Sequence, residues 1–452
     1  MFTLRQAPAL ASLSVRQAPA LTSLSVRQAP ALTSLSVRQA AGDTLVPSLV
    51  LDFAHLAALD PRLTFARAST GTYYDAAGVL RTAASGAARF TYDPITKESL
   101  GLLIEEQSTN RCLYSEDLTA TGWSTSTTSV TANAIAAPDG TTTADLLTPT
   151  AGVNSNRFRA VTFTGNGEKG LSVYLKAGSS ARTTVLLYDS TAAVGRHYIN
   201  VTWTAGVPTA ATFLGSGSVF SPESAGNGWY RIRFSATGVV AANSHIFGVS
   251  PDSLAGTGTV YLWGLQAEDL NVPTSYIPTA ASTVTRSADS CVMTGTAFSA
   301  WYRADEGTLV AKARPMAGVT IGVSPVVAAL VGADVNELIE VSRSSSPGTR
   351  NQAEVLIITA GAVQTNMFSF SAGTFVQNQL GRVAFGYKAN DCRGAGNGVL
   401  SASDTSVTLP TITQLSIGAR TASANRWWNG PVAFVAYYSI RLTDAQLQTV
   451  TL

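Results

Sequence analysis

Hydrophobic and polar residues alternate with a period of two in short segments along most of the chain. In the segment WYRIRF at 229–234, Tyr230, Ile232 and Phe234 form the apolar set. Successive side chains of a strand point to opposite faces, so this pattern predicts an antiparallel sheet with one buried face and one solvent-exposed face. Comparable segments, separated by turn signals such as Asn227–Gly228, predict strands at 170–176, 183–188, 197–203, 229–234, 260–266, 308–313, 353–358, 382–387 and 432–438.

These strand segments do not alternate with helical ones, which argues against a parallel nucleotide-binding sheet. We predict an all-β fold with two jelly-roll-like β-sandwiches, a small β connector and an extended N-terminal repeat arm. The predicted boundaries are 1–41 for the arm, 42–111 for the connector, 112–290 for the first sandwich and 291–452 for the second. Thr443–Asp444 followed by helix-forming residues predicts a short terminal helix.

An eleven-residue repeat occupies the N-terminal arm, and its second and third copies both read VRQAPALTSLS. That period is compatible with a right-handed coiled coil. Each full copy, however, contains a proline (Pro8, Pro19 and Pro30), and a proline costs roughly 3 kcal/mol inside a helix. We therefore predict short strands with one bend per copy, lying against other chains or a partner surface. The alternative interpretation of the arm is a flexible low-complexity leader.

The repeated Arg-Gln pairs suggest how the arm attaches. Identical peptides can each engage one of the equivalent patches that a symmetric particle offers, with arginine pairing with an acidic group. In the alternative, three chains entwine their arms into a stalk. The predicted anchoring residues are Arg5, Gln6, Arg16, Gln17, Arg27, Gln28, Arg38 and Gln39.

Composition narrows the function classes. Hydrophobic residues make up 45% and charged residues 13%, and the formal net charge of +2 gives no basic footprint for nucleic acid. The three cysteines, Cys112, Cys291 and Cys392, are an odd number without metal-ligand spacing, so we expect buried free thiols. The N-terminus has no apolar signal-peptide region. We expect synthesis in the host cytoplasm and no membrane insertion.

Catalytic motifs such as HExxH, GxSxG and the P-loop do not occur in the sequence. Glycan hydrolysis needs two carboxylates facing each other across a cleft. Asp334, Glu337 and Glu340 are close in sequence, as are Glu105 and Glu106, but adjacency along a chain does not make a cleft. We predict no enzyme activity, no cofactor and no metal, with a polysaccharide depolymerase as an alternative.

Sugar recognition combines flat aromatic rings with polar groups that hydrogen-bond hydroxyls. For Trp427 and Trp428, we expect one ring in the core and its neighbour exposed, because successive strand residues point to opposite faces. An exposed ring could equally be a subunit contact. The predicted carbohydrate-binding residues are Trp203, Trp301, Tyr302, Trp427, Trp428 and Asn429.

Several motifs resemble parts of known families. LDF at 51–53, LTFARAST at 63–70, ARF at 88–90 and GLLIEE at 101–106 together resemble a module common in bacteriophage fibre and spike proteins. GWYR at 228–231, GLQAE at 264–268 and TSYIP at 274–278 resemble a carbohydrate-binding jelly roll. LSIG at 415–418 and WNG at 428–430 are similar to concanavalin A or laminin-G-type sandwiches.

The resemblance implies a phage virion structural protein, a tail-fibre or head-spike subunit located in the particle. Its expected partners are other virion proteins (capsid, collar or tail) through the arm, and a host cell-surface glycan through the sandwiches. Self-association, as a trimer, is expected for a fibre-like protein. A structural decoration or collar protein without a ligand is the main alternative, because both sandwich types also serve as spacers.

Overall fold

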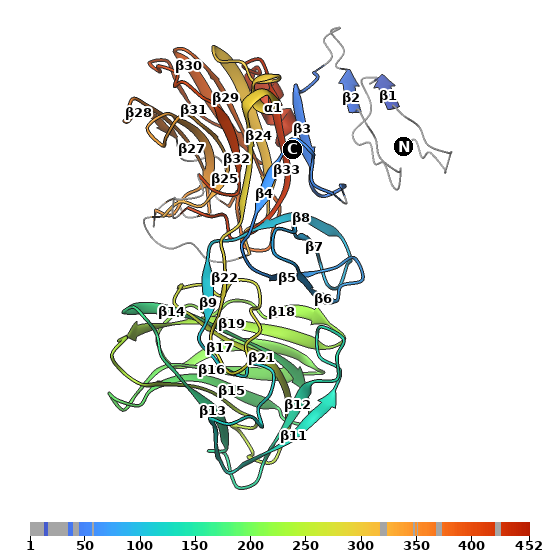
Figure 1. Ribbon diagram of the computed structural model, residues 1–452, viewed down its shortest axis with the longest axis vertical. Helices are drawn as coiled ribbons and strands as arrows, with labels where there is room; N and C mark the ends of the chain where they lie inside the picture. The colour runs from blue at the N-terminus through green and yellow to red at the C-terminus, as the bar shows by residue number, and fades with distance from the viewer. Residues whose placement is uncertain are drawn as a thin grey trace.

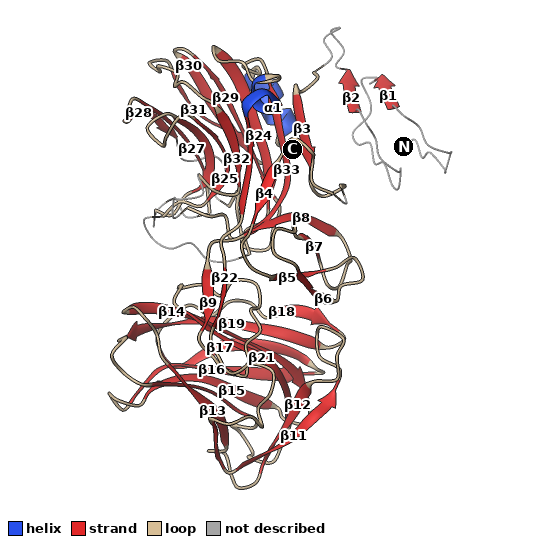
Figure 2. Cartoon of the chain, in the orientation of Figure 1, coloured by secondary structure: helices blue, strands red, loops and turns tan. Residues whose placement is uncertain are grey.

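The computed structural model describes residues 13–16, 35–38, 45–56, 58–316, 323–346, 349, 351–367, 373–420 and 426–452. Strands dominate this part of the chain (Figure 2), and its two helices are short: α1 (Gly295–Ser299) and α2 (Asp444–Val450). The all-β sandwich prediction is therefore confirmed. Figure 1 shows two bodies of stacked sheets, one formed by the middle of the chain and one containing its C-terminal part. No helix within the described ranges is long and apolar enough to cross a bilayer.

The middle sandwich consists of two six-stranded sheets that enclose a hydrophobic core. The distal sheet runs β10 (Trp123–Ser126), β13 (Asn156–Val161), β20 (His245–Ser250), β15 (Arg182–Asp189), β16 (Val194–Thr204) and β17 (Val207–Gly215). The proximal sheet, on the side of the C-terminal sandwich (Figure 1), runs β11 (Thr128–Ile135), β12 (Ala144–Pro149), β21 (Val260–Glu268), β14 (Gly167–Ala177), β19 (Trp229–Val239) and β18 (Glu223–Gly226).

Strand β19 follows its predicted alternation, but its polar face is not exposed to solvent. Ile232 and Phe234 lie in the core between the two sheets. Arg231 and Arg233 point to the other face, where they are only 5% and 1% exposed. Other parts of the chain cover that face, so the outer side of the proximal sheet is an interior surface. The prediction of a solvated polar face is wrong for this sheet.

The C-terminal sandwich stacks a seven-stranded sheet on an eight-stranded one. The first runs β28 (Ala362–Met367), β27 (Ala353–Thr359), β26 (Leu338–Arg343), β25 (Val326–Val331), β32 (Gln414–Ile417), β23 (Ser290–Thr294) and β4 (Thr64–Ala66). The second runs β31 (Val399–Asp404), β30 (Asp391–Gly396), β29 (Gly381–Lys388), β24 (Glu306–Ala313), β33 (Gly430–Tyr438), β8 (Ser99–Ile104) and β7 (Phe90–Tyr92), and β3 (Leu49–Asp52) also pairs with β33.

Helix α2 packs on the eight-stranded sheet through Leu447. Thr443 caps the helix in a capping box with Gln446, as its sequence predicts. The three cysteines are buried free thiols, which confirms that expectation. Burial raises the pKa of the Cys112 and Cys291 thiols to about 12.

The sheets of the C-terminal sandwich cross the predicted boundary of the connector. Strands β3, β4, β7 and β8 all come from residues 42–111, yet they pair into the two C-terminal sheets. Leu51, Phe53, Leu102 and Ile104 lie in the same core as β24 and β33. A short segment cannot bury such apolar side chains by itself, so it joins the larger core.

The rest of this segment covers the middle sandwich. Hairpin β5–β6 (Gly71–Tyr74 and Leu80–Ala83) places Leu80 and Tyr74 in a cluster with Trp229 and Trp263 of the proximal sheet. Strands β9 (Ser108–Asn110) and β22 (Val284–Arg286) pair where the chain passes between the two bodies (Figure 1). The outer face of the proximal sheet is thereby covered by the segment that connects the two sandwiches.

Two strands of the repeat arm are described. β1 (Leu13–Arg16) and β2 (Leu35–Arg38) pair in parallel, with Leu13 opposite Leu35 and Arg16 opposite Arg38. The paired residues are two periods of the repeat apart, so they occupy equivalent positions where the first copy meets the second and where the third meets the fourth. Six of the eight predicted anchoring residues lie outside the described residues: Arg5, Gln6, Gln17, Arg27, Gln28 and Gln39. The anchoring role of all eight residues stays a prediction.

The shared core predicts that residues 291–452 will not fold alone. Without β3 and β8, strand β33 loses its partners on one side and the core loses four large apolar side chains. We expect fragment 291–452 to be insoluble or to bind a hydrophobic dye strongly, whereas fragment 45–452 should unfold cooperatively. A soluble 291–452 fragment with a sharp thermal transition in circular dichroism would contradict this shared architecture.

Candidate functional site

A buried network of charges lies where the two sandwiches meet. This junction cluster comprises Arg67, Arg89, Glu105, Arg286 and Asp289, each of them 3% exposed or less. Asp289 binds Arg89 at 2.5 Å and Arg67 at 3.2 Å, and Glu105 binds Arg89 at 2.8 Å and Arg286 at 3.1 Å. Buried charges are tolerated when they are paired and hydrogen-bonded. The cluster therefore fixes the segments that carry it in one arrangement.

Glu105 connects two members of the cluster, Arg89 and Arg286, to the middle sandwich. Its carboxylate accepts hydrogen bonds from the Ser275 backbone N–H and hydroxyl, both at 2.6 Å. Burial alone would raise the pKa of this carboxyl. The Arg286 and Arg89 guanidinium groups and the Ser275 hydrogen bonds outweigh burial and lower the pKa to about 2. Glu105 is thus held as an anion in the interior.

Three of the five members of this cluster belong to motifs that resemble the phage module. Arg67 belongs to LTFARAST, Arg89 to ARF and Glu105 to GLLIEE, and Ser275 belongs to TSYIP. These segments are far apart in the sequence and converge through side-chain contacts. The motifs therefore serve assembly, because their charged groups face one another and not solvent.

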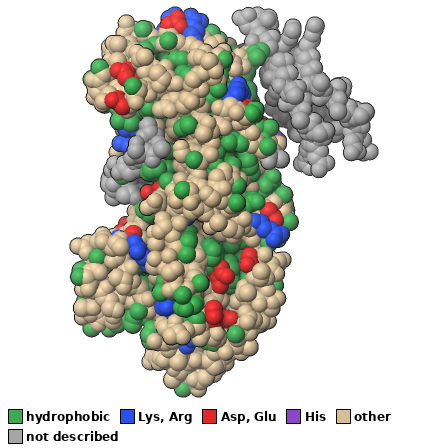
Figure 3. Space-filling model, viewed as in Figure 1, with side chains coloured by type: hydrophobic (Ala, Val, Ile, Leu, Met, Phe, Trp, Pro, Cys, Tyr) green, Lys and Arg blue, Asp and Glu red, His purple; other side chains and the backbone are tan. Residues whose placement is uncertain are grey.

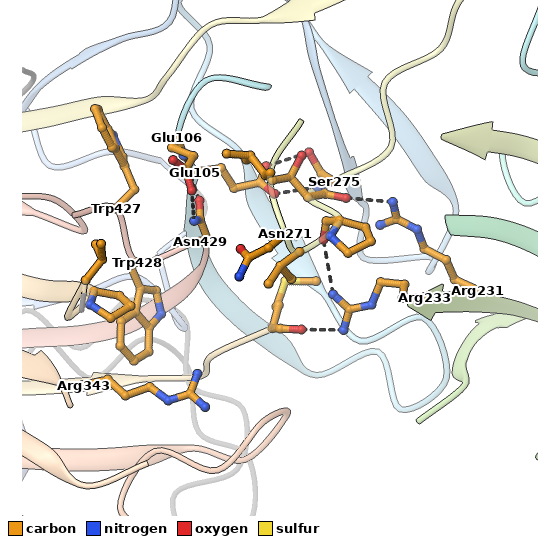
Figure 4. A pocket seen from close by; sticks show the side chains of 17 residues that line it. Glu105, Glu106, Arg231, Arg233, Asn271, Ser275, Arg343, Trp427, Trp428 and Asn429 are labelled. Atoms are coloured by element: carbon orange, nitrogen blue, oxygen red, sulfur yellow. Dashed lines mark hydrogen bonds between the residues drawn. The ribbon is translucent and has the colours of Figure 1, made fainter. Parts of the chain in front are cut away.

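A small cleft beside the cluster contains three of the predicted sugar-binding residues (Figure 4). Trp427, Trp428 and Asn429 line it together with Glu106. The Asn429 side chain donates to Glu106 at 2.5 Å and accepts from the Glu106 backbone N–H at 2.9 Å. Trp427 donates its indole N–H to the Asp289 carbonyl at 3.0 Å, and Trp428 donates to the Pro431 carbonyl at 3.3 Å.

The polar atoms of this trio are therefore already paired with Glu106 and with the carbonyls of Asp289 and Pro431. The cleft encloses about 50 Å³, whereas small-molecule pockets measure roughly 300–1,000 Å³. Such a space is suited to a few water molecules. Trp428 is buried and Trp427 is half-buried, so the expected contrast between neighbouring rings is present. The half-buried ring, however, faces the junction and not an open surface.

The other predicted aromatic residues lie in the cores. Trp203 is 9% exposed and donates to the Thr183 hydroxyl at 3.1 Å. Trp301 is 6% exposed and packs edge-on against Phe298 and Tyr437. Tyr302 stacks on Phe298 with 4.7 Å between ring centroids. Neither Trp203 nor Trp301 offers a free ring face to a ligand, because packing already uses it.

An aromatic surface that the sequence did not single out lies on the outward face of the distal sheet. One register position runs through all six strands, and we call it the central row. Its half-buried or exposed large members are Phe158, Leu186, Tyr198 and Leu214, with Leu214 45% exposed. The full central row, from edge to edge, is Ser124, Phe158, Gly248, Leu186, Tyr198 and Leu214.

Two further rows flank the central row. The tyrosine row consists of Ala160, Ile246, Tyr188 and Gly195. On the opposite side, the polar row consists of Ser250, Thr184, Asn200 and Ala211. In the polar row, the Thr184 hydroxyl donates to the Asn200 side-chain oxygen at 2.7 Å. Thr184 and Ser250 are buried, with 6% and 4% exposure, whereas Asn200 is half-buried and remains partly accessible. Aromatic rings and one amide therefore lie side by side on this face.

Two glycines leave room for the large side chains to pack on this face, because they have no Cβ. A Cβ at Gly195 would lie 2.3 Å from a Leu214 methyl and 3.0 Å from the Tyr198 ring. A Cβ at Gly248 would lie 2.7 Å from the Cβ of Phe158. Burial and the neighbouring Tyr188 raise the pKa of Tyr198, which is consistent with two phenols close together. The three rows therefore form a packed surface whose own members are uncharged.

The carboxylates considered for hydrolysis have structural partners. Glu340 is buried and binds Arg420 at 2.6 Å and 2.9 Å. Glu337 accepts from the backbone N–H groups of Ala360 and Thr411 at 2.8 Å and 2.9 Å. Glu105 and Glu106 belong to the junction, where burial raises the pKa of Glu106. These groups therefore organise loops and interfaces.

The residues of the distal face were missed because their signal is ambiguous in sequence. Leu186, Tyr188 and Tyr198 lie in segments that alternate as any half-buried strand does. Alternation predicts two faces without indicating which one the rest of the chain will cover. A row of aromatic residues at matching positions of paired strands would be the usable signal, but it requires the strand register.

Comparisons with known proteins add only fold-level likeness. No protein-family model and no curated protein matches the chain. A NanB sialidase from Streptococcus pneumoniae matches at 15% identity and a TM-score of 0.29, over 36% of this chain and 26% of that one. Domain 4 of the arabinanase AbnA from Geobacillus stearothermophilus, solved with arabinotriose, matches at 12% and 0.29, over 40% and 82%.

Mouse laminin alpha1 domains LG4-5 match at 10% identity and a TM-score of 0.23, over 62% of this chain and 86% of that one. For the NanB sialidase named above, the match covers only about a quarter of that chain. At such identities and TM-scores these likenesses carry no argument about function. The candidate surface rests on the geometry of the distal sheet.

The charge state of Glu105 generates a prediction about acid stability. Its folded pKa of about 2 lies below the ordinary value of 4.5, so its contribution is complete above pH 4.5 and is lost as pH falls toward 2. We expect Glu105→Gln to remove on the order of 3 kcal/mol of unfolding free energy near neutral pH and to flatten this acid-dependent loss. Urea unfolding of both proteins across this pH range measures the difference.

Exposed Glu98 in the same segment provides the matched control. Glu98→Gln should change the unfolding free energy by less than about 0.5 kcal/mol. Equal acid sensitivity in wild type and Glu105→Gln would show that the junction cluster does not hold the sandwiches as described.

Proposed function

We propose that the chain is a non-catalytic glycan-binding protein and that the outward face of the distal sheet is its binding surface. One observation carries this proposal: the central row aligns Phe158, Leu186 and Tyr198 beside half-buried Asn200, whose side-chain oxygen accepts from the buried Thr184 hydroxyl. Aromatic rings cover the apolar faces of sugar rings, and neighbouring hydroxyls and amides hydrogen-bond their edges. The other large sheet face of this sandwich is occupied by the junction.

The proposed biological setting is a phage particle, with the chain as a fibre or spike subunit. The motif resemblance and the eleven-residue repeat support this setting. The arm would attach to other virion proteins, and the sandwiches would be displayed toward the host surface. Because the C-terminal sandwich is joined rigidly to the middle one through the junction cluster, the distal face would be presented at a fixed orientation. A homotrimer is the proposed assembly.

Single substitutions on the central row should weaken glycan binding without unfolding the protein. We expect Phe158→Ala and Tyr198→Ala each to lower affinity about tenfold, because a lost aromatic contact is worth roughly 1.4 kcal/mol. The measurement is a glycan array of the full chain, followed by titration of the best ligand. Val363→Ala, at a 61% exposed apolar position on the C-terminal sandwich, is the control.

Trp427→Phe separates the two candidate surfaces. It keeps a ring at the junction and should leave affinity unchanged if the distal face is the site. Loss of binding in Trp427→Phe with full binding in the two central-row variants would contradict the proposal. A full array without any bound glycan would favour the decoration protein, and shortening of host polysaccharide would favour the depolymerase.

The arm generates a separate prediction for particle assembly. Deleting one repeat copy, residues 15–25, should lower incorporation into particles in a stepwise manner, because fewer equivalent patches are engaged. The amount of the chain per purified particle measures this effect. Deletion of 26–36 as well should lower it further. Unchanged incorporation in both deletions would count against anchoring by the repeats.

A further inference from the structure

The distal face contains no charged side chain in any of its three defined rows. Their members are serine, phenylalanine, glycine, leucine, tyrosine, alanine, isoleucine, threonine and asparagine. On the face of the molecule seen in Figure 3, charged side chains are scattered and few. Arg182 lies on this face one register position beyond the polar row, opposite Thr202, and its guanidinium donates to the Ser253 hydroxyl and carbonyl. A carboxylate or sulfate placed on the three rows themselves would lose hydration without gaining a counter-charge. This chemistry disfavours acidic glycans.

The length of the central row disfavours a single sugar as the ligand. Adjacent strands lie about 4.8 Å apart, so the row extends roughly 24 Å from Ser124 to Leu214. Phe158 and Tyr198 are separated by three strand spacings, or about 14 Å at their backbones. A pyranose ring is comparable in size to one aromatic ring. One sugar therefore cannot contact both ends of the aromatic set.

The order of the rows also gives the ligand a direction. A ligand lying along the central row, across the strands, places its ring faces on Phe158, Leu186 and Tyr198. One edge of the ligand then meets the Asn200 amide of the polar row, and the other edge meets Tyr188 of the tyrosine row. A ligand along a single strand would meet alternating apolar and polar rows. The arrangement across the strands matches the two-sided polarity of an extended sugar chain.

We propose that the distal face takes a neutral, extended polysaccharide chain that lies across the strands of the distal sheet. This inference rests on the proposed function and specifies its ligand class. Contacts at several rings distribute the binding energy along the chain. Affinity should therefore grow with ligand length up to the extent of the row, and it should be insensitive to salt because no ion pair forms.

The test uses the full chain in native affinity gels that contain neutral polymers (hydroxyethyl cellulose, xylan, glucomannan, amylose) or acidic ones (polygalacturonate, alginate, hyaluronan). We expect retardation by at least one neutral polymer, unchanged on addition of 0.5 M NaCl. By calorimetry, the matching hexasaccharide should bind at least tenfold more tightly than its monosaccharide. Phe158→Ala and Tyr198→Ala should each weaken the hexasaccharide about tenfold and leave monosaccharide binding low.

Thr202→Ala is the matched control, because Thr202 is exposed on the same face of β16, beyond the polar row. Salt-sensitive retardation by acidic polymers alone, lost in Phe158→Ala, would overturn this inference while the proposed function stands. Equal affinity for monosaccharide and hexasaccharide would also overturn this inference and leave the proposed function standing. Retardation that persists in both aromatic variants would overturn both proposals. Self-association that Phe158→Ala abolishes would assign the face to a second copy and also overturn both.

Discussion

Three buried arginines and two buried carboxylates at the junction constrain the whole molecule. Arg67, Arg89 and Arg286 cannot be solvated where they lie, so each must remain within reach of Glu105 or Asp289. Removing Glu105, for example, takes away the carboxylate that Arg286 binds and one of the two that Arg89 binds. Leaving a buried charge without its partner costs about 3–5 kcal/mol. The charges discriminate strongly against alternative arrangements of the segments that carry them. Two sandwiches thereby become one body.

This constraint determines which surfaces remain free. The junction and hairpin β5–β6 cover the outer face of the proximal sheet, where Trp229, Trp263 and Tyr174 pack together. Helix α2 covers part of the eight-stranded sheet of the C-terminal sandwich. The distal sheet keeps an outward face with half-buried rings. A chain with 13% charged residues thus displays an uncharged aromatic surface at a fixed orientation to its arm-bearing sandwich.

The sequence predicted the local structure well and the tertiary roles only in part. Period-two alternation correctly placed strands such as β19, and the Thr443 cap correctly placed α2. It could not show that Arg231 faces an interior surface, because burial there depends on residues far away in the chain. The same limit applies to β3 and β8, whose partners in β33 are more than 300 residues away.

The candidate site was harder to predict for a related reason. Tryptophan is the most conspicuous residue for sugar stacking, yet Trp203, Trp301 and Trp428 fill cores because large rings are also the most effective core residues. Phe158, Tyr188 and Tyr198 gain their significance from register alone. The motifs that resemble phage modules proved informative about assembly, since their Arg67, Arg89 and Glu105 pair with Asp289 and Arg286 in the junction cluster.

Hydroxyl-radical footprinting with and without bound glycan tests the central claim most directly, because it reports the solvent contact of individual side chains. The account predicts that ligand protects Phe158, Tyr188 and Tyr198 from oxidation while Trp427 and exposed Ile95 react as before. Protection confined to Trp427 and its neighbours, with the distal face still fully reactive, would contradict it.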